Sequence, residues 1–233
     1  MAYVQPSYHW LIAGAEDNVV YVFRNLDALL DYPPDSTSDD VSPAPVRLSH
    51  PLLTPTSDVR IYTAYTRALL VCNSHVLQLT FDRRTASPVL AVVDELAGLG
   101  VARVSAGGDR FGVLTPAGEV YLVEDGVERL SVGREGLGIE NEGDGDGGEE
   151  DELDELEIED VALGDGFIAV LSSGRVYARG DSESPAPSVL TADTFGQLGG
   201  LAGDVRDWTH VPAPGRVSRI YAGRFSLLVD VEA

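Results

Sequence analysis

A short pattern of strands and turns recurs along the sequence, and this repetition limits the fold more than any other feature. The clearest copy is Val101–Tyr121, in which two apolar–polar alternations are separated by a break at Ala106–Gly108, and the second runs through a turn at Gly118. This is the pattern of two or three short strands joined by tight turns. Ala106–Tyr121 aligns without a gap with Ala162–Tyr177, with seven identities in sixteen positions.

Weaker copies lie on both sides of this pair, and their spacing indicates the architecture. The tyrosine or leucine that follows each turn falls at Tyr21, Leu77, Tyr121 and Tyr177, with spacings of 56, 44 and 56 residues. Asn18 stands where the later units have glycine, and asparagine tolerates the left-handed backbone conformation next best. In the second unit Asn73–Ser74 lie at the turn. A fifth unit begins at Val217. Units of about 40–60 residues with several short strands are typical of propeller blades.

We therefore predict an all-β chain, in which residues 1–233 form a single β-propeller domain with fewer than seven full blades or an incomplete ring. Met1–Tyr8 is a candidate for completing the last blade. Two insertions interrupt the units: residues 31–55 are rich in Pro, Ser and Asp, and residues 139–157 form an acidic tract that we expect to be disordered. Leu26–Leu30 and Asp94–Leu99 are the best candidates for short helices.

Three short motifs follow one another in the second half of the chain. They are Gly174-x-Val176-Tyr177-x-x-Gly180, then Gly196-Gln197-Leu198-Gly199, then Val217-x-x-Ile220-x-Ala222-Gly223. In this order they resemble the repeat of the regulator-of-chromosome-condensation (RCC-type) family, with Arg179 where that family usually has tryptophan. The resemblance is strong from about Val101 onward and implies a propeller of RCC-type repeats.

The resemblance assigns structural roles to the motif residues. Glycines permit sharp turns and the close approach of neighbouring blades. Gln197 would satisfy backbone groups where a loop passes between blades, and Leu198 would anchor that loop in the core. The tyrosines are interpreted as packing residues between blades. The expected structural set is Gly107, Gly118, Tyr121, Gly174, Tyr177, Gly180, Gly196, Gln197, Leu198, Gly199 and Gly223.

The net charge of the chain limits the classes of partner that it can bind. The formal net charge is −22, and the 13 acidic residues of Ile139–Asp160 account for only part of it. A chain this acidic repels a phosphate backbone, so direct binding of nucleic acid is disfavoured. All 16 basic residues are arginine. Schiff-base chemistry and a phosphate-binding loop lysine are therefore excluded.

Residues suited to catalysis or metal binding do not form a recognisable set. The four histidines are not spaced as ligand pairs, and Cys72 is the single cysteine and lies in an apolar run, so we expect no zinc site. The acidic tract does not have the ligand spacing of a calcium loop. We therefore predict no catalytic residue, no cofactor and no metal.

The lone cysteine also indicates a reducing compartment, because it cannot support a disulfide framework. The sequence shows no secretory signal, and no apolar run approaches the length of a membrane span. We expect a protein of the cytoplasm, the nucleus or both.

The function that these observations favour is a non-enzymatic adaptor that presents propeller loops to a protein partner. Trp208 is the candidate partner-binding residue, because tryptophan is enriched at interface hot spots; packing within its own blade is the alternative. The chain is similar to the fungal alpha-tubulin suppressor type of the RCC-type family. That similarity implies, as partner, a small zinc protein needed for diphthamide synthesis and Elongator-dependent modification of the tRNA wobble uridine.

Two alternatives remain open. One is a guanine-nucleotide exchange regulator of a small GTPase. The other is an acidic histone-binding protein, in which Ile139–Asp160 engages basic tails.

Overall fold

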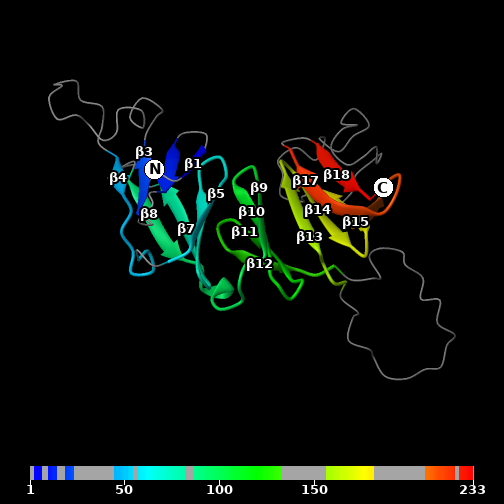
Figure 1. The fold of residues 1–233 in the computed structure, drawn as a ribbon, viewed down its shortest axis with the longest axis horizontal. Helices are drawn as coiled ribbons and strands as arrows, with labels where there is room; N and C mark the ends of the chain where they lie inside the picture. The colour runs from blue at the N-terminus through cyan, green and yellow to red at the C-terminus, as the bar shows by residue number, and fades with distance from the viewer. Residues whose placement is uncertain are drawn as a thin grey trace. The chain divides into compact units, whose positions relative to one another are not determined.

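The computed structural model describes residues 3–6, 10–14, 19–23, 45–54, 57–81, 87–132, 156–180, 208–223 and 226–232 (Figure 1). They fall into two compact units, 1–101 and 102–233. Nearly all the regular structure consists of short antiparallel strands that pair in chain order within each sheet. The described residues include no helix long and apolar enough to cross a membrane.

The first unit contains two four-stranded sheets. The first sheet consists of β1 (Tyr3–Pro6), β2 (Leu11–Gly14), β3 (Val20–Phe23) and β4 (Val46–Arg47). The second sheet consists of β5 (Val59–Thr63), β6 (Ala68–Cys72), β7 (His75–Phe81) and β8 (Pro88–Val92), and is followed by a 3-10 turn, η1 (Asp94–Leu96). Ile12, Val22, Leu70 and Leu77 lie in the core that the two sheets share.

The second unit contains two four-stranded sheets and one sheet of two strands. The third sheet is β9 (Arg103–Gly107), β10 (Arg110–Leu114), β11 (Val120–Val123) and β12 (Val127–Leu130). The fourth is β13 (Asp160–Gly164), β14 (Phe167–Ser172), β15 (Arg175–Gly180) and β16 (Thr209–Val211). The two-stranded sheet is β17 (Val217–Ala222) and β18 (Leu227–Val231).

Each sheet corresponds to one unit of the sequence repeat, which confirms the predicted all-β architecture. Tyr21, Leu77, Tyr121 and Tyr177 all lie in the third strand of their sheet, and Val217 begins the two-stranded sheet as expected. Residues 3–6 of the candidate closing segment pair with β2 in the first sheet, not with the last one. The single-domain organisation over residues 1–233 stays a prediction.

The predicted turns adopt the backbone conformation that their residues suggest. Asn73, Gly118 and Gly174 have φ values of 55°, 82° and 75°. Ser173 precedes Gly174 with φ 52°, so both residues of this two-residue turn have positive φ, as in a type I′ hairpin.

The two best copies of the repeat differ by one residue in register. Gly107 pairs with Arg110 in the third sheet and Gly164 with Phe167 in the fourth, so the first hairpins are 57 residues apart. The third strands are 56 apart, because the turn from β14 to β15 has two residues and the turn from β10 to β11 has three between the paired Thr115 and Glu119. The ungapped alignment is therefore right for the third strands and wrong by one residue for the first hairpin.

The insertions and the expected helices differ in part from the prediction. Val46–Arg47, within the Pro/Ser/Asp-rich insertion, form the short outer strand β4 and pair with Tyr21 and Val22. In the acidic insertion, the Leu156 N–H donates to the Val132 carbonyl, and residues 139–155 lie outside the described residues. Asp94–Leu96 form a single 3-10 turn, and Leu26–Leu30 also lie outside the described residues.

Two apolar clusters join the sheets of the second unit. One packs Leu114, Val120 and Leu130 of the third sheet against one face of the fourth, including Val170 and Tyr177. The other packs the opposite face of the fourth sheet against the two-stranded sheet, through Phe167, Leu171, Val176, Val211, Val217 and Ile220. The fourth sheet is thus covered on both faces, and the two-stranded sheet on one.

Candidate functional site

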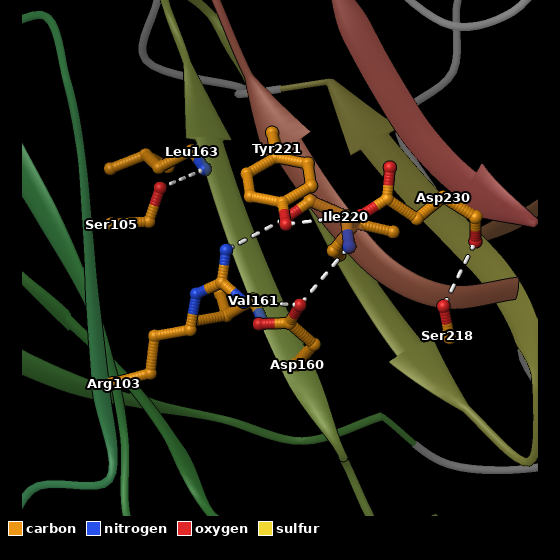
Figure 2. Close-up of polar contacts among 9 residues, drawn as sticks. All are labelled: Arg103, Ser105, Asp160, Val161, Leu163, Ser218, Ile220, Tyr221 and Asp230. Carbon is orange, nitrogen blue, oxygen red and sulfur yellow. Dashed lines mark hydrogen bonds and ion pairs between the residues drawn. The ribbon is translucent and has the colours of Figure 1, made fainter.

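The first strands of the three sheets in the second unit are joined by one buried carboxylate (Figure 2). Asp160, at the start of β13, is 3% exposed. Its Oδ2 accepts hydrogen bonds from Arg103 Nη1 of β9 at 2.5 Å and from the Ile220 N–H of β17 at 3.0 Å, and its Oδ1 accepts from the Val161 N–H at 2.8 Å. Arg103 Nη2 donates to the Ile220 carbonyl at 2.8 Å. The charges of Arg103 and Asp160 are therefore used to hold strands together.

The same strands approach closely at Gly107. A Cβ at this position would lie 2.5 Å from the carbonyl oxygens of both Leu163 and Gly164. The Leu163 N–H donates to Ser105 Oγ at 2.9 Å, which joins β13 to β9 a second time (Figure 2). Glycine at this position permits the contact between adjacent sheets that the repeat motif implies.

The outer face of the two-stranded sheet is polar and open. Tyr221 is 39% exposed and its hydroxyl donates to Asp230 Oδ2 at 3.1 Å, while its ring lies 5.4 Å from the Arg103 guanidinium carbon. Leu228, on the same face of β18, is 62% exposed. This face therefore combines exposed aromatic, aliphatic and acidic side chains.

A concavity adjoins the end of β18. It has a volume of about 470 Å³ and is lined by the β14–β15 turn and by residues 210–216, with Arg175, His210 and Arg216 as its basic groups. Arg216 Nε lies 3.5 Å from Glu232 Oε2, and a Cβ on Gly215 would lie 2.8 Å from Val231 Cγ1. The concavity and the C-terminal end of β18 are therefore parts of one surface.

The residues predicted as the structural motif are distributed over the turns and the packed faces. Tyr177 is 3% exposed and packs between the third and fourth sheets, and the Tyr121 hydroxyl donates to Glu119 at 3.2 Å. Gly180 pairs with Phe167, and the Gly223 N–H donates to the Ser226 carbonyl. Gly196, Gln197, Leu198 and Gly199 lie outside the described residues.

Trp208, predicted as a partner contact, lies inside the second unit. Its side chain is 7% exposed in the cluster between the third and fourth sheets. The indole N–H donates to the Ser131 carbonyl at 3.2 Å, and the Arg179 guanidinium carbon lies 5.2 Å from the ring centroid. These contacts account for a tryptophan at this position without any ligand. A role in partner binding stays a prediction.

Few other described side chains could take part in catalysis or metal binding. Cys72 is 1% exposed, and burial raises the pKa of its thiol from 9.0 to about 11, so very little nucleophilic thiolate exists near pH 7. Among the described ranges, no three His, Cys, Asp or Glu side chains are grouped to hold a metal ion.

Sequence reasoning missed the Arg103–Asp160 pair. The signal was present, because the two residues occupy the same first position of successive repeat units, 57 residues apart, with opposite charges. The ungapped alignment of Ala106–Tyr121 with Ala162–Tyr177 began after both residues and so did not compare them.

No protein-family model and no curated protein sequence matches the chain. Solved structures match the chain in fold. Human WBSCR16 aligns over 100% of this chain with a TM-score of 0.58 and 14% identity, and Prp20p from Saccharomyces cerevisiae aligns over 99% with a TM-score of 0.53 and 13% identity. The chain spans 58% and 56% of the length of those two chains, which are RCC1-like β-propellers.

Proposed function

The chain is an RCC-type β-propeller in fold, as its repeats predicted, and we propose that it acts as a non-enzymatic adaptor that binds a protein partner. The location we propose is the cytoplasm or the nucleus, where its lone Cys72 remains reduced.

The main support for the proposal is that the described residues best suited to catalysis have structural roles. The buried charged group best placed for chemistry, Asp160, accepts three hydrogen bonds and joins three strands. This carboxylate is 3% exposed and its three hydrogen bonds are made within the junction between strands, so it is not presented to a substrate; burial raises the pKa of the Cys72 thiol to about 11, which keeps it protonated near pH 7. By contrast, the two-stranded sheet exposes Tyr221, Leu228 and Asp230 on one face. An exposed mixed surface of this kind suits a macromolecular partner better than a small substrate.

The similarity to the fungal alpha-tubulin suppressor type makes a small zinc protein of diphthamide synthesis and Elongator-dependent tRNA modification the first partner to test. Prp20p, whose structure was described together with its binding to Gsp1p and histones, supports the broader class of protein binding. The exchange-factor alternative predicts release of labelled guanine nucleotide from a small GTPase. The histone alternative loses one of its acidic residues, because Asp160 is buried and paired.

The test is affinity capture with the folded full chain, followed by titration calorimetry with the purified small zinc protein. We expect a stable stoichiometric complex and no acceleration of nucleotide release at micromolar concentrations of the chain. The variant Asp160→Asn, which we expect to be less stable, is the control: it tests whether the captured protein binds to unfolded chain. Turnover of a small molecule, with no protein bound stably, would overturn the proposal.

A further inference from the structure

Arg103 contacts a sheet that is not its neighbour along the chain. It lies in β9 of the third sheet, and its Nη2 donates to the Ile220 carbonyl in β17 at 2.8 Å. The fourth sheet comes between these two sheets in the sequence. In a repeat protein whose units contact only their immediate neighbours, stability is a sum of unit terms and nearest-neighbour terms. This hydrogen bond adds a term that links the third sheet to β17 directly.

Asp160 of the fourth sheet closes a triangle of contacts with these two residues (Figure 2). Its Oδ2 accepts hydrogen bonds from Arg103 Nη1 and from the Ile220 N–H, the latter at 3.0 Å. The N–H and the carbonyl of Ile220 are therefore both bound by side chains of other sheets. Arginine can do this because its planar guanidinium presents two donor nitrogens in a fixed geometry.

The triangle is buried, so the loss of one contact is not compensated by water. Asp160 is 3% exposed and Ile220 0%. A buried backbone group without a partner costs free energy comparable to a lost hydrogen bond. Displacing the Arg103 guanidinium would leave the Ile220 carbonyl without this donor and would free Asp160 to move away from the Ile220 N–H. Both effects weaken the attachment of β17, and neither requires the fourth sheet to open.

Ser105, two residues further along β9, makes a contact of the ordinary kind. Its Oγ accepts the Leu163 N–H at 2.9 Å, which joins β9 to the adjacent strand β13. One strand thus carries a side chain that bonds to the neighbouring sheet and another that also bonds to the sheet beyond it. The two side chains allow direct coupling and nearest-neighbour coupling to be compared.

We propose that Arg103 couples β17 directly to the third sheet, so that a change at β9 alters how firmly β17 is held without first loosening the fourth sheet. Arg103 is a positioning residue in this arrangement. It holds Asp160 where the carboxylate accepts the Ile220 N–H, and it binds the Ile220 carbonyl itself. The coupling goes beyond the proposed adaptor function and does not depend on it.

Arg103→Lys tests the coupling. Lysine keeps the positive charge beside Asp160, but a single ammonium nitrogen cannot replace the two nitrogens that bind Asp160 and Ile220. Residue-resolved hydrogen exchange of the full chain, followed by NMR spectroscopy, measures the Ile220 amide, and β14 reports on opening of the fourth sheet. The exchange rate at Ile220 should rise at least tenfold more than the rates in β14.

Ser105→Ala is the matched control on the same strand. It removes the acceptor of the Leu163 N–H, so the exchange rate at Leu163 should rise at least tenfold. The rate at Ile220 should rise no more than the rates in β14. Thermal melting checks that Arg103→Lys and Ser105→Ala remain folded.

A measurement on the wild type needs no substitution. Arg103 Nη1 and Nη2 are held by different sheets, so rotation of the guanidinium should be slow and NMR spectroscopy should resolve separate signals for the two groups. Arg129, whose side chain is 49% exposed in its pair with Glu119, should give one averaged signal.

Three results would overturn the inference. With Arg103→Lys, a rise at Ile220 no larger than that in β14 would mean that the third sheet acts on β17 only through the fourth. An equal rise at Ile220 with Ser105→Ala would remove the special role of Arg103. An averaged signal for Arg103 in the wild type would show that its guanidinium is not held at Ile220.

Discussion

Arg103 and Asp160 form an ion pair of 2.5 Å between β9 and β13, and the same carboxylate accepts the Ile220 N–H of β17. The side chain of Asp160 is 4% exposed and that of Arg103 29%. Removing one partner of a buried pair leaves the other charge without compensation, which costs about 3–5 kcal/mol. The junction is therefore a main determinant of how the sheets of the second unit hold together.

Asp160→Asn tests this junction. The amide keeps the shape of the carboxylate but loses its charge and one acceptor oxygen, so we expect the free energy of unfolding to fall by about 3 kcal/mol. Urea denaturation measures it. The matched control is Arg129→Gln, which breaks the exposed pair with Glu119 and should cost less than about 1 kcal/mol. Similar losses for both variants would contradict the assigned role.

Gly107→Ala tests the close approach of β9 and β13. The added methyl group would lie 2.5 Å from two carbonyl oxygens of the neighbouring strand, which cannot move aside independently. We expect a loss of at least about 2 kcal/mol, measured by urea denaturation. Gly126→Ala is the control, because nothing lies within 4 Å of a Cβ at that position, and should change stability by less than about 0.5 kcal/mol. If Gly107→Ala leaves the stability unchanged, the third and fourth sheets must lie further apart at this position than the structure shows.

Trp208→Phe separates the structural role of this residue from the predicted contact with a partner. Phenylalanine cannot donate to the Ser131 carbonyl and stacks less well on Arg179, so stability should fall by about 1–2 kcal/mol. Thermal and urea unfolding measure the loss, and partner capture is measured in parallel. Unchanged stability with weakened capture would assign Trp208 to the interface instead.

The thiol of Cys72 predicts a dependence of stability on alkaline pH. Burial raises its pKa from 9.0 to about 11, so the folded thiol stays protonated where the unfolded one ionises. Its contribution is therefore complete below pH 9 and is lost as the pH rises toward 11, by about 2 kcal/mol at pH 10.5. The measurement is the difference in unfolding free energy between wild type and Cys72→Ala at pH 7.5 and 10.5, in which other groups cancel. A difference that does not change with pH would refute the raised pKa.

The sequence predicted the fold well because the repeat is local. Each turn depends on residues such as Asn73, Gly118 and Gly174, whose positive φ follows from their own chemistry. The valine and tyrosine that follow the turn alternate with period two and reveal the strand directly. Strands joined by turns of two or three residues then pair as neighbours. The outer strands β4 and β16 do not follow in this way, because 22 and 28 residues separate them from β3 and β15.

The site was harder to predict because it depends on contacts between units. The pairing of Arg103 with Asp160 needs the one-residue shift between the two turns, and that shift appears only when the strands are paired. Leu228 is an apolar strand residue, and its 62% exposure arises because no described sheet packs against its face of the two-stranded sheet. Neither fact can be obtained from alternation alone.

Native-state hydrogen exchange on the chain alone tests the central claim most directly. Among the described strands β18 pairs with β17 alone, so the amides at residues 227–231 should exchange at least about 100-fold faster than those of the buried second strands at 68–72, 110–114 and 167–172. Exchange at residues 227–231 as slow as in those three strands would contradict this pairing.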